Sequence, residues 1–179
     1  MSLGKLMLVT IFLSPIIGAA AAAAESAHSP DTCKTDANFR AQDFTVGSWD
    51  VYRANTKTAE VKMELILNDC AIRQTWTVPA AKTTGNVAGL FSYSPIQKGW
   101  IYAFSTDYAN NNYFIGQLVS PGQMRYETKV TLPEGNVRLR RWTLSLQGDG
   151  SVVEKSVGST DDGKTWSDEY ELIWKKKTS

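Results

Sequence analysis

Short runs of alternating apolar and polar residues fill the chain from Phe44 onwards, and turn residues separate one run from the next. Residues 124–130 show the pattern clearly, with Met, Tyr, Thr and Val at even positions and Arg, Glu and Lys between them. Turn sequences such as 110–112 and 148–150 interrupt the runs at short intervals. Alternation at period two is typical of strands with one buried face. About eight to ten strands with short connections predict an all-β protein, an antiparallel up-and-down β-barrel rather than a Greek-key sandwich.

Two of the runs indicate which side chains should face the barrel interior. Within 137–146, the apolar residues move from odd to even positions at Arg140 and Arg141, which predicts a β-bulge there. In the last run, Tyr170 takes an inward position and Glu169 is assigned to the outer surface. The chain has 6 Trp, 7 Tyr and 6 Phe, so the interior should be rich in aromatic rings.

The first 24 residues have the organisation of a secretory signal peptide. Lys5 precedes an apolar run over 6–17, and an alanine tract ends at Ala24. Cleavage near Ala24 would place a soluble mature protein in the periplasm or outside the cell. No later segment has the roughly 20 apolar residues that a transmembrane helix needs. Loss of the leader leaves 18 of the 19 basic residues against 18 acidic ones, a balance that argues against nucleic acid as a partner.

The two cysteines lie on either side of the expected domain boundary. Residues 25–43 are polar and without periodicity, which predicts an irregular N-terminal arm ahead of a single barrel domain at 44–177. Cys33 in the arm and Cys70 in the barrel are expected to form one disulfide in an oxidising compartment. This bond would pin the arm to the barrel and add roughly 4 kcal/mol by loop entropy. His28, the only histidine, lies in the arm and is assigned no function.

The segment Ser-Thr-Asp-Asp-Gly-Lys-Thr-Trp, which begins at Ser159, predicts a hairpin turn between the last two strands. Ser159 and Asp161 carry short acceptors for the turn's own amides, Gly163 supplies a positive φ, and Trp166 can cover the turn. The spacing resembles the Asp-box that sialidases and other propeller proteins repeat at blade turns. It occurs once here, which argues against a propeller. The resemblance therefore implies a structural turn, with no catalytic role.

The first strand carries a second family signature, Gly47-x-Trp49. At this position the chain resembles the lipocalin and fatty-acid-binding (calycin) families, whose first strand has Gly-x-Trp near the barrel floor. The resemblance implies a calycin-like barrel and, by analogy, an interior ligand. In those families a basic side chain from near the last strand covers the tryptophan, and Arg140 is assigned that structural role here. The full set of candidates for it is Arg138, Arg140, Arg141 and Lys175.

The whole region from Phe44 onwards is similar to a group of secreted bacterial calycin-like proteins of unknown function. That group begins with Phe-x-x-Gly-x-Trp and ends with the Asp-box pattern and a Tyr-rich strand. The resemblance implies a fold and no particular activity. The residues that carry the match are Phe44, Gly47, Trp49, Ser159, Asp161, Gly163, Thr165, Trp166 and Tyr170.

Catalytic chemistry has few candidates in this sequence. The predicted barrel has no histidine, which excludes a Ser-His-Asp triad, a histidine-bound zinc and a proximal-histidine haem. Asp161 and Asp162 are the most visible carboxylate pair for glycosidase chemistry, but adjacent residues on a tight turn point apart. Calcium at Asp161, Asp162 and Asp168 is a minor alternative, because the spacing departs from known loop patterns. The sequence therefore predicts neither an enzyme nor a cofactor or metal.

The preferred hypothesis is a periplasmic or secreted protein that holds a small, mostly apolar ligand inside the barrel. The arginines at 138–141 either lie on a solvated face, or place one guanidinium inward to bind an anionic head group. The alternative hypothesis is an envelope interaction or inhibitor module with a filled barrel, and a hydrolase acting on sugars is a third. The predicted lining residues of the binding site are Met63, Gln74, Trp76, Tyr102, Tyr126, Trp142 and Tyr170.

Overall fold

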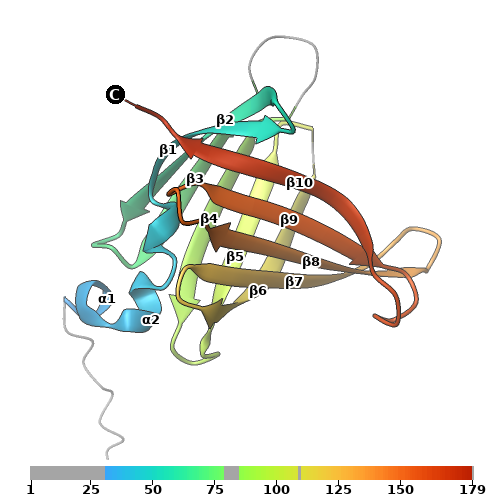
Figure 1. Ribbon diagram of the computed structural model, residues 1–179. Coiled ribbons are helices and arrows are strands. Elements are labelled where there is room, and N and C mark those ends of the chain that lie inside the picture. Colours follow the sequence, from blue (N-terminus) through green and yellow to red (C-terminus); the bar gives the residue numbers. More distant parts are fainter. Residues whose placement is uncertain (1–30, 79–84, 109, 179) are drawn as a thin grey trace, which may run out of the picture.

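Ten antiparallel strands form a closed up-and-down barrel in the computed structural model, which describes residues 31–78, 85–108 and 110–178 (Figure 1). Each strand pairs with its neighbours in sequence, and the first strand closes the barrel against the last. The predicted architecture is confirmed. The predicted signal peptide and His28 lie outside the described residues. The strands are β1 (Gly47–Arg53), β2 (Thr56–Ile66), β3 (Ala71–Thr77), β4 (Val87–Ser94), β5 (Gly99–Thr106), β6 (Asn111–Ser120), β7 (Gln123–Thr131), β8 (Val137–Leu146), β9 (Val152–Ser159) and β10 (Ser167–Lys176).

The hydrophobic core lies inside the barrel, because alternate residues of each strand point inward. In β7, for example, Met124 and Tyr126 are fully buried while Glu127 is exposed. The core thus collects large side chains from every strand. Its buried members are Trp49, Val51, Ala59, Val61, Met63, Ile72, Phe91, Trp100, Tyr102, Phe114, Met124, Tyr126, Trp142, Leu144, Val152 and Trp174.

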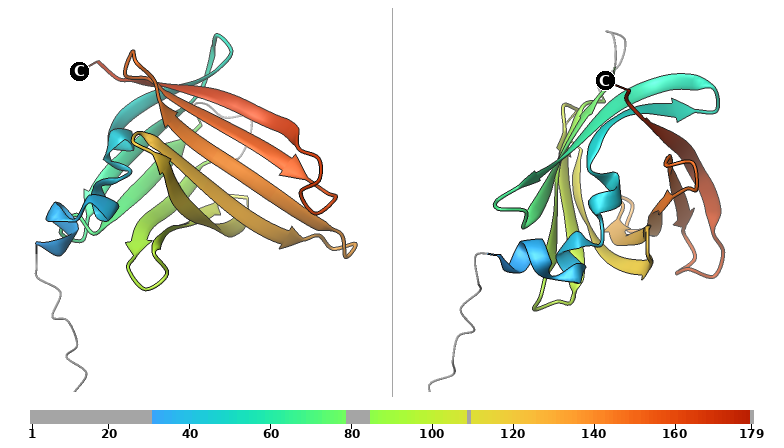
Figure 2. Two further views of the ribbon diagram at one scale, coloured as in Figure 1. Left: turned by 60° about the horizontal axis from the view of Figure 1, so that its bottom comes forward. Right: turned by 60° about the vertical axis from the view of Figure 1, so that its left-hand side comes forward.

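The N-terminal segment contains three short helices, α1 (Thr32–Thr35), α2 (Ala37–Arg40) and η1 (Asp43–Thr45), so the prediction of an irregular arm was wrong there. A cap explains the second helix: the Asp36 carboxylate accepts the Asn38 N–H at 2.8 Å. One-turn helices are too short to show the periodicity that sequence patterns detect. Figure 2 shows them gathered at one end of the barrel, next to the start of β1.

The segment that carries these helices closes that end of the barrel. Gln42 is fully buried and its side-chain oxygen accepts a hydrogen bond from the Tyr126 hydroxyl. Phe39 packs edge-on against Tyr93, with ring centroids 5.2 Å apart. The Trp100 indole donates to a backbone carbonyl of α2 at 3.2 Å. Polar and apolar contacts together therefore seat the arm on the barrel floor.

A disulfide between Cys33 and Cys70 fastens the arm to the turn between β2 and β3, as predicted. Arg40 reinforces the attachment by donating a hydrogen bond to the carbonyl of Asp69 in the same turn. Residues 67 to 69 all have positive φ, a strained backbone that these contacts help to hold.

Trp49 is covered by Lys176 and not by Arg140, which corrects the sequence-based assignment. The Lys176 ammonium lies 5.7 Å from the centre of the Trp49 ring, because the two residues are register partners in β1 and β10. Lys175, another candidate, lies over Tyr52 at 5.0 Å. The Trp49 indole donates to the Thr45 carbonyl at 2.8 Å, which joins the tryptophan to the arm.

The β9–β10 turn is held together by its own side chains. Asp161 accepts hydrogen bonds from the backbone N–H and the hydroxyl of Thr165, at 2.9 and 2.6 Å, and from the Ser159 hydroxyl at 2.7 Å. These bonds lower the pKa of Asp161 to about 2. Gly163 has φ +84°, and the Trp166 indole donates to its carbonyl at 3.0 Å. Arg141 stacks on the Trp166 ring at 4.2 Å. The residue roles predicted for this turn are thus observed.

Replacing Gly163 by alanine is expected to lower the free energy of unfolding by about 1 kcal/mol, because a side chain is disfavoured at positive φ. Gly148→Ala is the matched control, since Gly148 lies in another turn without positive φ and with open space around it. Urea unfolding of the two variants measures the difference. Equal midpoints would show that the Gly163 conformation is not strained by a side chain.

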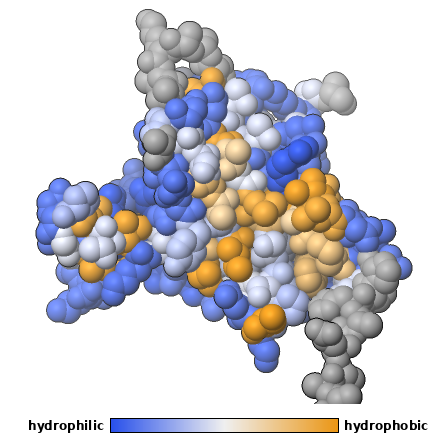
Figure 3. All heavy atoms as spheres, turned by 180° about the vertical axis from the view of Figure 1, so that it is seen from behind, coloured by the Kyte–Doolittle hydropathy of each residue, from blue (hydrophilic) through white to orange (hydrophobic). Residues whose placement is uncertain are grey.

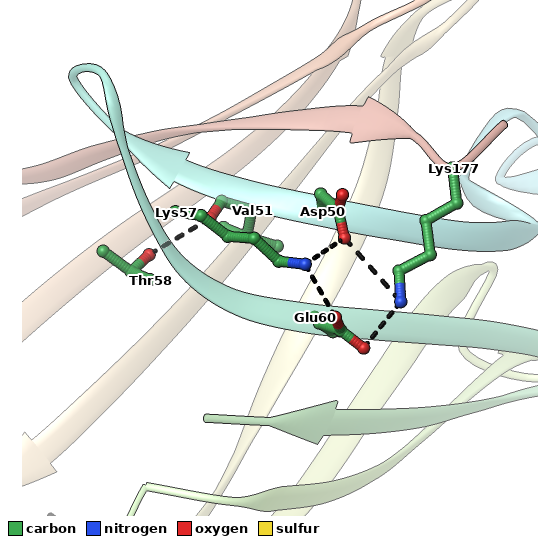
Figure 4. A network of polar contacts seen from close by, with 6 residues as sticks. All are labelled: Asp50, Val51, Lys57, Thr58, Glu60 and Lys177. Carbon is green, nitrogen blue, oxygen red and sulfur yellow. Dashed lines mark hydrogen bonds and ion pairs between the residues drawn. The ribbon is translucent and has the colours of Figure 1, made fainter. Parts of the chain in front are cut away.

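A surface network joins β1, β2 and the chain end after β10 at the seam where the barrel closes (Figure 4). The Lys57 ammonium lies 2.8 Å from Asp50 and 2.7 Å from Glu60, and the Lys177 ammonium lies 2.6 Å from Glu60. Exposed ion pairs contribute little singly, but here two cations bridge two carboxylates.

No helix among the described residues is long and apolar enough to cross a membrane.

Candidate functional site

A cavity of about 390 Å³ lies in the barrel at the end opposite the N-terminal helices. Its position follows from the strands: β1 starts beside η1 and ends at Arg53, which lines the cavity together with Tyr108 from the β5–β6 turn. Tyr108 is half exposed, so the cavity is open to solvent at this end. The lining residues are Arg53, Gln74, Trp76, Val87, Tyr102, Phe104, Thr106, Tyr108, Asn110, Phe114, Arg140, Trp142, Glu154, Tyr170 and Leu172.

Most of the residues predicted to line a binding site border this cavity, namely Gln74, Trp76, Tyr102, Trp142 and Tyr170. Their part in ligand binding stays a prediction. The remaining two lie deeper in the core. Met63 is paired with Gly47 near the barrel floor. Tyr126 is fully buried, and its hydroxyl is bonded to Gln42 of the arm. The alternation of residues in each strand therefore predicted which side chains point into the barrel. It did not predict how far each side chain lies from the open end.

Tyr102 is the centre of the aromatic wall. Its ring stacks on Phe91 with a centroid distance of 4.0 Å and on Phe104 at 5.4 Å. Tilted contacts to Trp142 at 5.2 Å and Phe114 at 6.1 Å extend the cluster around the barrel. Stacked and tilted rings fix one another's orientation. The cavity therefore has rigid, flat aromatic faces.

Gly89 leaves the space that Tyr102 needs. A Cβ atom at Gly89 would lie 2.6 Å from the Tyr102 ring and 2.9 Å from the Gln74 side-chain oxygen. In the absence of that atom, the Tyr102 hydroxyl donates to Gln74 at 2.5 Å. Burial raises the pKa of Tyr102 far above its ordinary value, so this hydroxyl stays protonated. The hydrogen-bonded side chains of Tyr102 and Gln74 therefore place polar groups at a fixed position in the cavity wall.

Glu154 is a buried carboxyl group in the cavity wall, only 5% exposed. It accepts hydrogen bonds from the Tyr170 hydroxyl at 2.9 Å and from the Trp174 indole at 2.8 Å. Burial raises its pKa to about 7, and these bonds partly oppose that effect. Trp142 Nε1 is also buried and makes no well-formed hydrogen bond to a described residue. As a weak third donor to the carboxyl group, the Trp142 indole also helps to lower the pKa of Glu154.

Charged side chains gather beside the aromatic wall towards the open end. Glu169 pairs with Arg138 and with Arg140, whose Nε lies 2.6 Å from the carboxylate, and Ser156 donates to it at 2.8 Å. Burial works to raise the pKa of Glu169, but the Ser156 hydroxyl and the two arginines hold it below its usual value. The carboxylate is thus ionised at neutral pH and orients both guanidinium groups.

The strand register at this cluster differs from the sequence-based prediction. Glu169 was assigned to the outer surface, but β10 has an irregularity between Asp168 and Tyr170 that turns Glu169 inward. The bulge predicted at Arg140 and Arg141 is absent, because β8 keeps an unbroken register with both β7 and β9. Arg140 therefore shares the inward face with Trp142, and Arg141 points outward.

The sequence reasoning did not select Glu154, because the residue types of β9 do not mark its inner face. Positions 152, 154, 156 and 158 share one parity and are all buried, but three of them hold Glu, Ser and Gly, while Val153 and Val157 lie on the opposite face. Arg53 was missed because it lies at the end of β1, where parity no longer indicates whether a side chain faces a cavity. Its place at the mouth depends on which strand ends lie together, a property of the closed barrel.

The arrangement offers binding groups and gives little support to the minor metal alternative. The Asp161 carboxylate is bonded within its own turn, and Asp168 pairs with Lys155 at 3.1 Å. In the described part of the chain, no group of three or more His, Cys, Asp or Glu side chains is placed to hold a metal ion. The absence of catalysis stays a prediction.

Comparisons of the sequence with protein-family models and with curated proteins find no match. The class of the protein therefore rests on its architecture, an all-β barrel of the calycin type, closed by ten antiparallel strands. Membership of the secreted calycin-like group stays a prediction.

Proposed function

We propose that this protein is a periplasmic or secreted carrier that binds a small, mostly apolar molecule inside the barrel. The observation that carries the proposal is the cavity of about 390 Å³ with aromatic walls at one end of the barrel. Its volume falls in the range of small-molecule sites, which are mainly apolar with a few fixed polar groups. Gln74, Glu154 and Trp142 supply such groups.

The construction of the barrel supports a carrier rather than a packed scaffold. Large side chains and the arm fill the end near η1, while the other end keeps a space among rings that already contact one another. The disulfide is compatible with an oxidising compartment, where the predicted leader would deliver the protein.

The proposal can be tested with N-phenyl-1-naphthylamine, an uncharged apolar dye that fluoresces when it leaves water. Tryptophan at Val87 and Leu172 together would occupy cavity space, and we expect this Val87→Trp/Leu172→Trp variant to bind the dye at least fivefold more weakly. The neighbouring residues Ala88 and Glu171 are exposed, so Ala88→Trp/Glu171→Trp is the matched control and should bind normally. Equal affinity in both double variants would place the dye outside the cavity.

Native mass spectrometry of the protein from its own cell envelope complements the dye titration. A small molecule that co-purifies with wild type and is absent from the Val87→Trp/Leu172→Trp variant would support the proposal and give the ligand's mass. A wild-type protein that binds neither dye nor any natural molecule would contradict it.

An interaction module is the second candidate function, favoured by an apolar outer face on β4, β5 and β6. Leu90, Ala103 and Tyr113 are register partners across these strands and point outward, and Ile115 is exposed beside them. Figure 3 shows apolar side chains gathered on the rear of the molecule. Exposed apolar patches often mark protein contacts. An envelope protein that co-purifies with wild type but not with a Leu90→Glu/Tyr113→Glu variant would favour this candidate.

A further inference from the structure

The cavity wall consists mainly of rings. Among the residues that line it, only Val87 and Leu172 are aliphatic, whereas Tyr102, Phe104 and Trp142 present aromatic faces held by mutual contacts. A flat aromatic ligand can stack or lie edge-on against such faces, with a gain beyond the burial of area. A flexible acyl chain would also bury apolar surface in the cavity, but it would not gain the additional stacking energy between flat rings. The wall therefore selects for a ring-shaped ligand body.

The open end of the cavity carries an excess of positive charge. Arg53 and Arg140 line it, and Arg138 lies next to Arg140 on the inward face of β8. Glu169 is the one carboxylate that pairs with these arginines, and no ion pair joins Arg53 to a described residue. Arg140 pairs with Glu169 through Nε, and a guanidinium has five N–H groups, so donors remain for the cavity. The positive charge at the open end of the cavity therefore favours the binding of an anion.

The Trp142 indole N–H points to the same ligand chemistry. Trp142 Nε1 is a donor only and is buried in the wall beside the Glu154 carboxyl, to which it makes no well-formed hydrogen bond. The Glu154 carboxyl, the main acceptor in the wall, already receives two hydrogen bonds. A ligand rich in acceptors would satisfy the indole N–H and avoid competing for Glu154.

We propose that the ligand is a planar aromatic molecule with one anionic group, whose ring lies against Tyr102 and Trp142 and whose anion binds Arg140 and Arg53. This inference rests on the proposed function and adds to it the charge and shape of the ligand. A guanidinium binds a carboxylate or a similar oxyanion through paired N–H groups, so the mouth fixes the orientation in which the ring enters.

Calorimetric titration of the full protein with three probes tests the inference. The probes are 2-naphthoate, the uncharged 2-naphthamide of the same shape, and decanoate, which has the same charge on an acyl chain. We expect wild type to bind 2-naphthoate about tenfold more tightly than either other probe, the effect of one charge-assisted contact. Arg140→Gln should lose about tenfold for 2-naphthoate and less than about twofold for 2-naphthamide.

Arg141→Gln is the matched control, because Arg141 is the next residue, points outward, and is held by Glu127 at 2.8 Å and by Trp166. It should leave all three affinities unchanged. Arg53→Gln is a second test that does not disturb the Glu169 cluster, and it should weaken 2-naphthoate selectively. Circular dichroism checks that each variant is folded.

The outcomes separate the inference from the proposed function. Equal affinities for 2-naphthoate and 2-naphthamide, or tighter binding of decanoate, would overturn the anionic aromatic ligand while the cavity remained a binding site. If wild type bound none of these probes and no N-phenyl-1-naphthylamine, both the inference and the proposed function would be overturned.

Discussion

The free energy of unfolding is expected to fall by about 3 kcal/mol as the pH rises from about 4.5 to 7. The cause is Glu154, whose pKa burial raises from 4.5 to about 7 in the folded protein. Between these values the folded state keeps the proton and the unfolded state releases it. The contribution is therefore fully present below pH 4.5 and is lost as the pH passes 7. Urea unfolding at half-unit pH steps between 5 and 8 measures it.

Glu154→Gln is expected to remove this dependence and to be more stable than wild type above pH 7. The amide can accept the Trp174 N–H and donate to the Tyr170 hydroxyl, as a protonated carboxyl would. Glu171→Gln, on the exposed face of the neighbouring strand β10, should keep the wild-type slope. The pKa values of Glu169 and Asp161 are lowered, so these carboxylates act at lower pH. Burial raises the pKa of Asp43, which both variants keep. A wild-type protein with flat stability from pH 5 to 8 would contradict the assignment.

The Cys33→Ala/Cys70→Ala variant is expected to be about 4 kcal/mol less stable than wild type. The disulfide closes a loop with a sequence separation of 37, and its loss lets the unfolded chain expand. The arm should also loosen, since the disulfide is the covalent link between α1 and the β2–β3 turn. Thermal and urea unfolding measure the change.

Reduction of the wild-type protein provides the control for this variant. A reducing agent should bring wild type to the stability of the variant and leave the variant unchanged. Binding of N-phenyl-1-naphthylamine by the folded variant should persist, because the disulfide and the cavity lie at opposite ends of the barrel. Unchanged stability after reduction would show that contacts such as those of Arg40 and Phe39 hold the arm by themselves.

Alternation of residues was enough to predict the barrel, because a strand buried on one face must repeat at period two. It was also enough to place Gln74, Trp76 and Tyr102 inside. It failed where the backbone departs from that period: the irregularity at Glu169 left no mark in the residue types, and the parity change at Arg140 came from an inward arginine rather than from a bulge.

The position of a side chain along the barrel axis also could not be predicted from the sequence. Tyr126 and Tyr102 have the same residue type and parity, yet one bonds to the arm and the other lines the cavity. The difference arises from which end the arm closes, and the one-turn helices of the arm have no periodic pattern. The partner of Trp49 was similarly decided by strand register, which put Lys176 directly opposite.

The irregularity in β10 means that the ionic character of the mouth depends on the number of residues in the chain as well as on their kind. A deletion of one residue at Asp168 would restore regular pairing with β9 and turn the Glu169 carboxylate to solvent, leaving Arg138 and Arg140 uncompensated. One deletion at this position would thus change the charge at the mouth while every ring of the wall stayed in place.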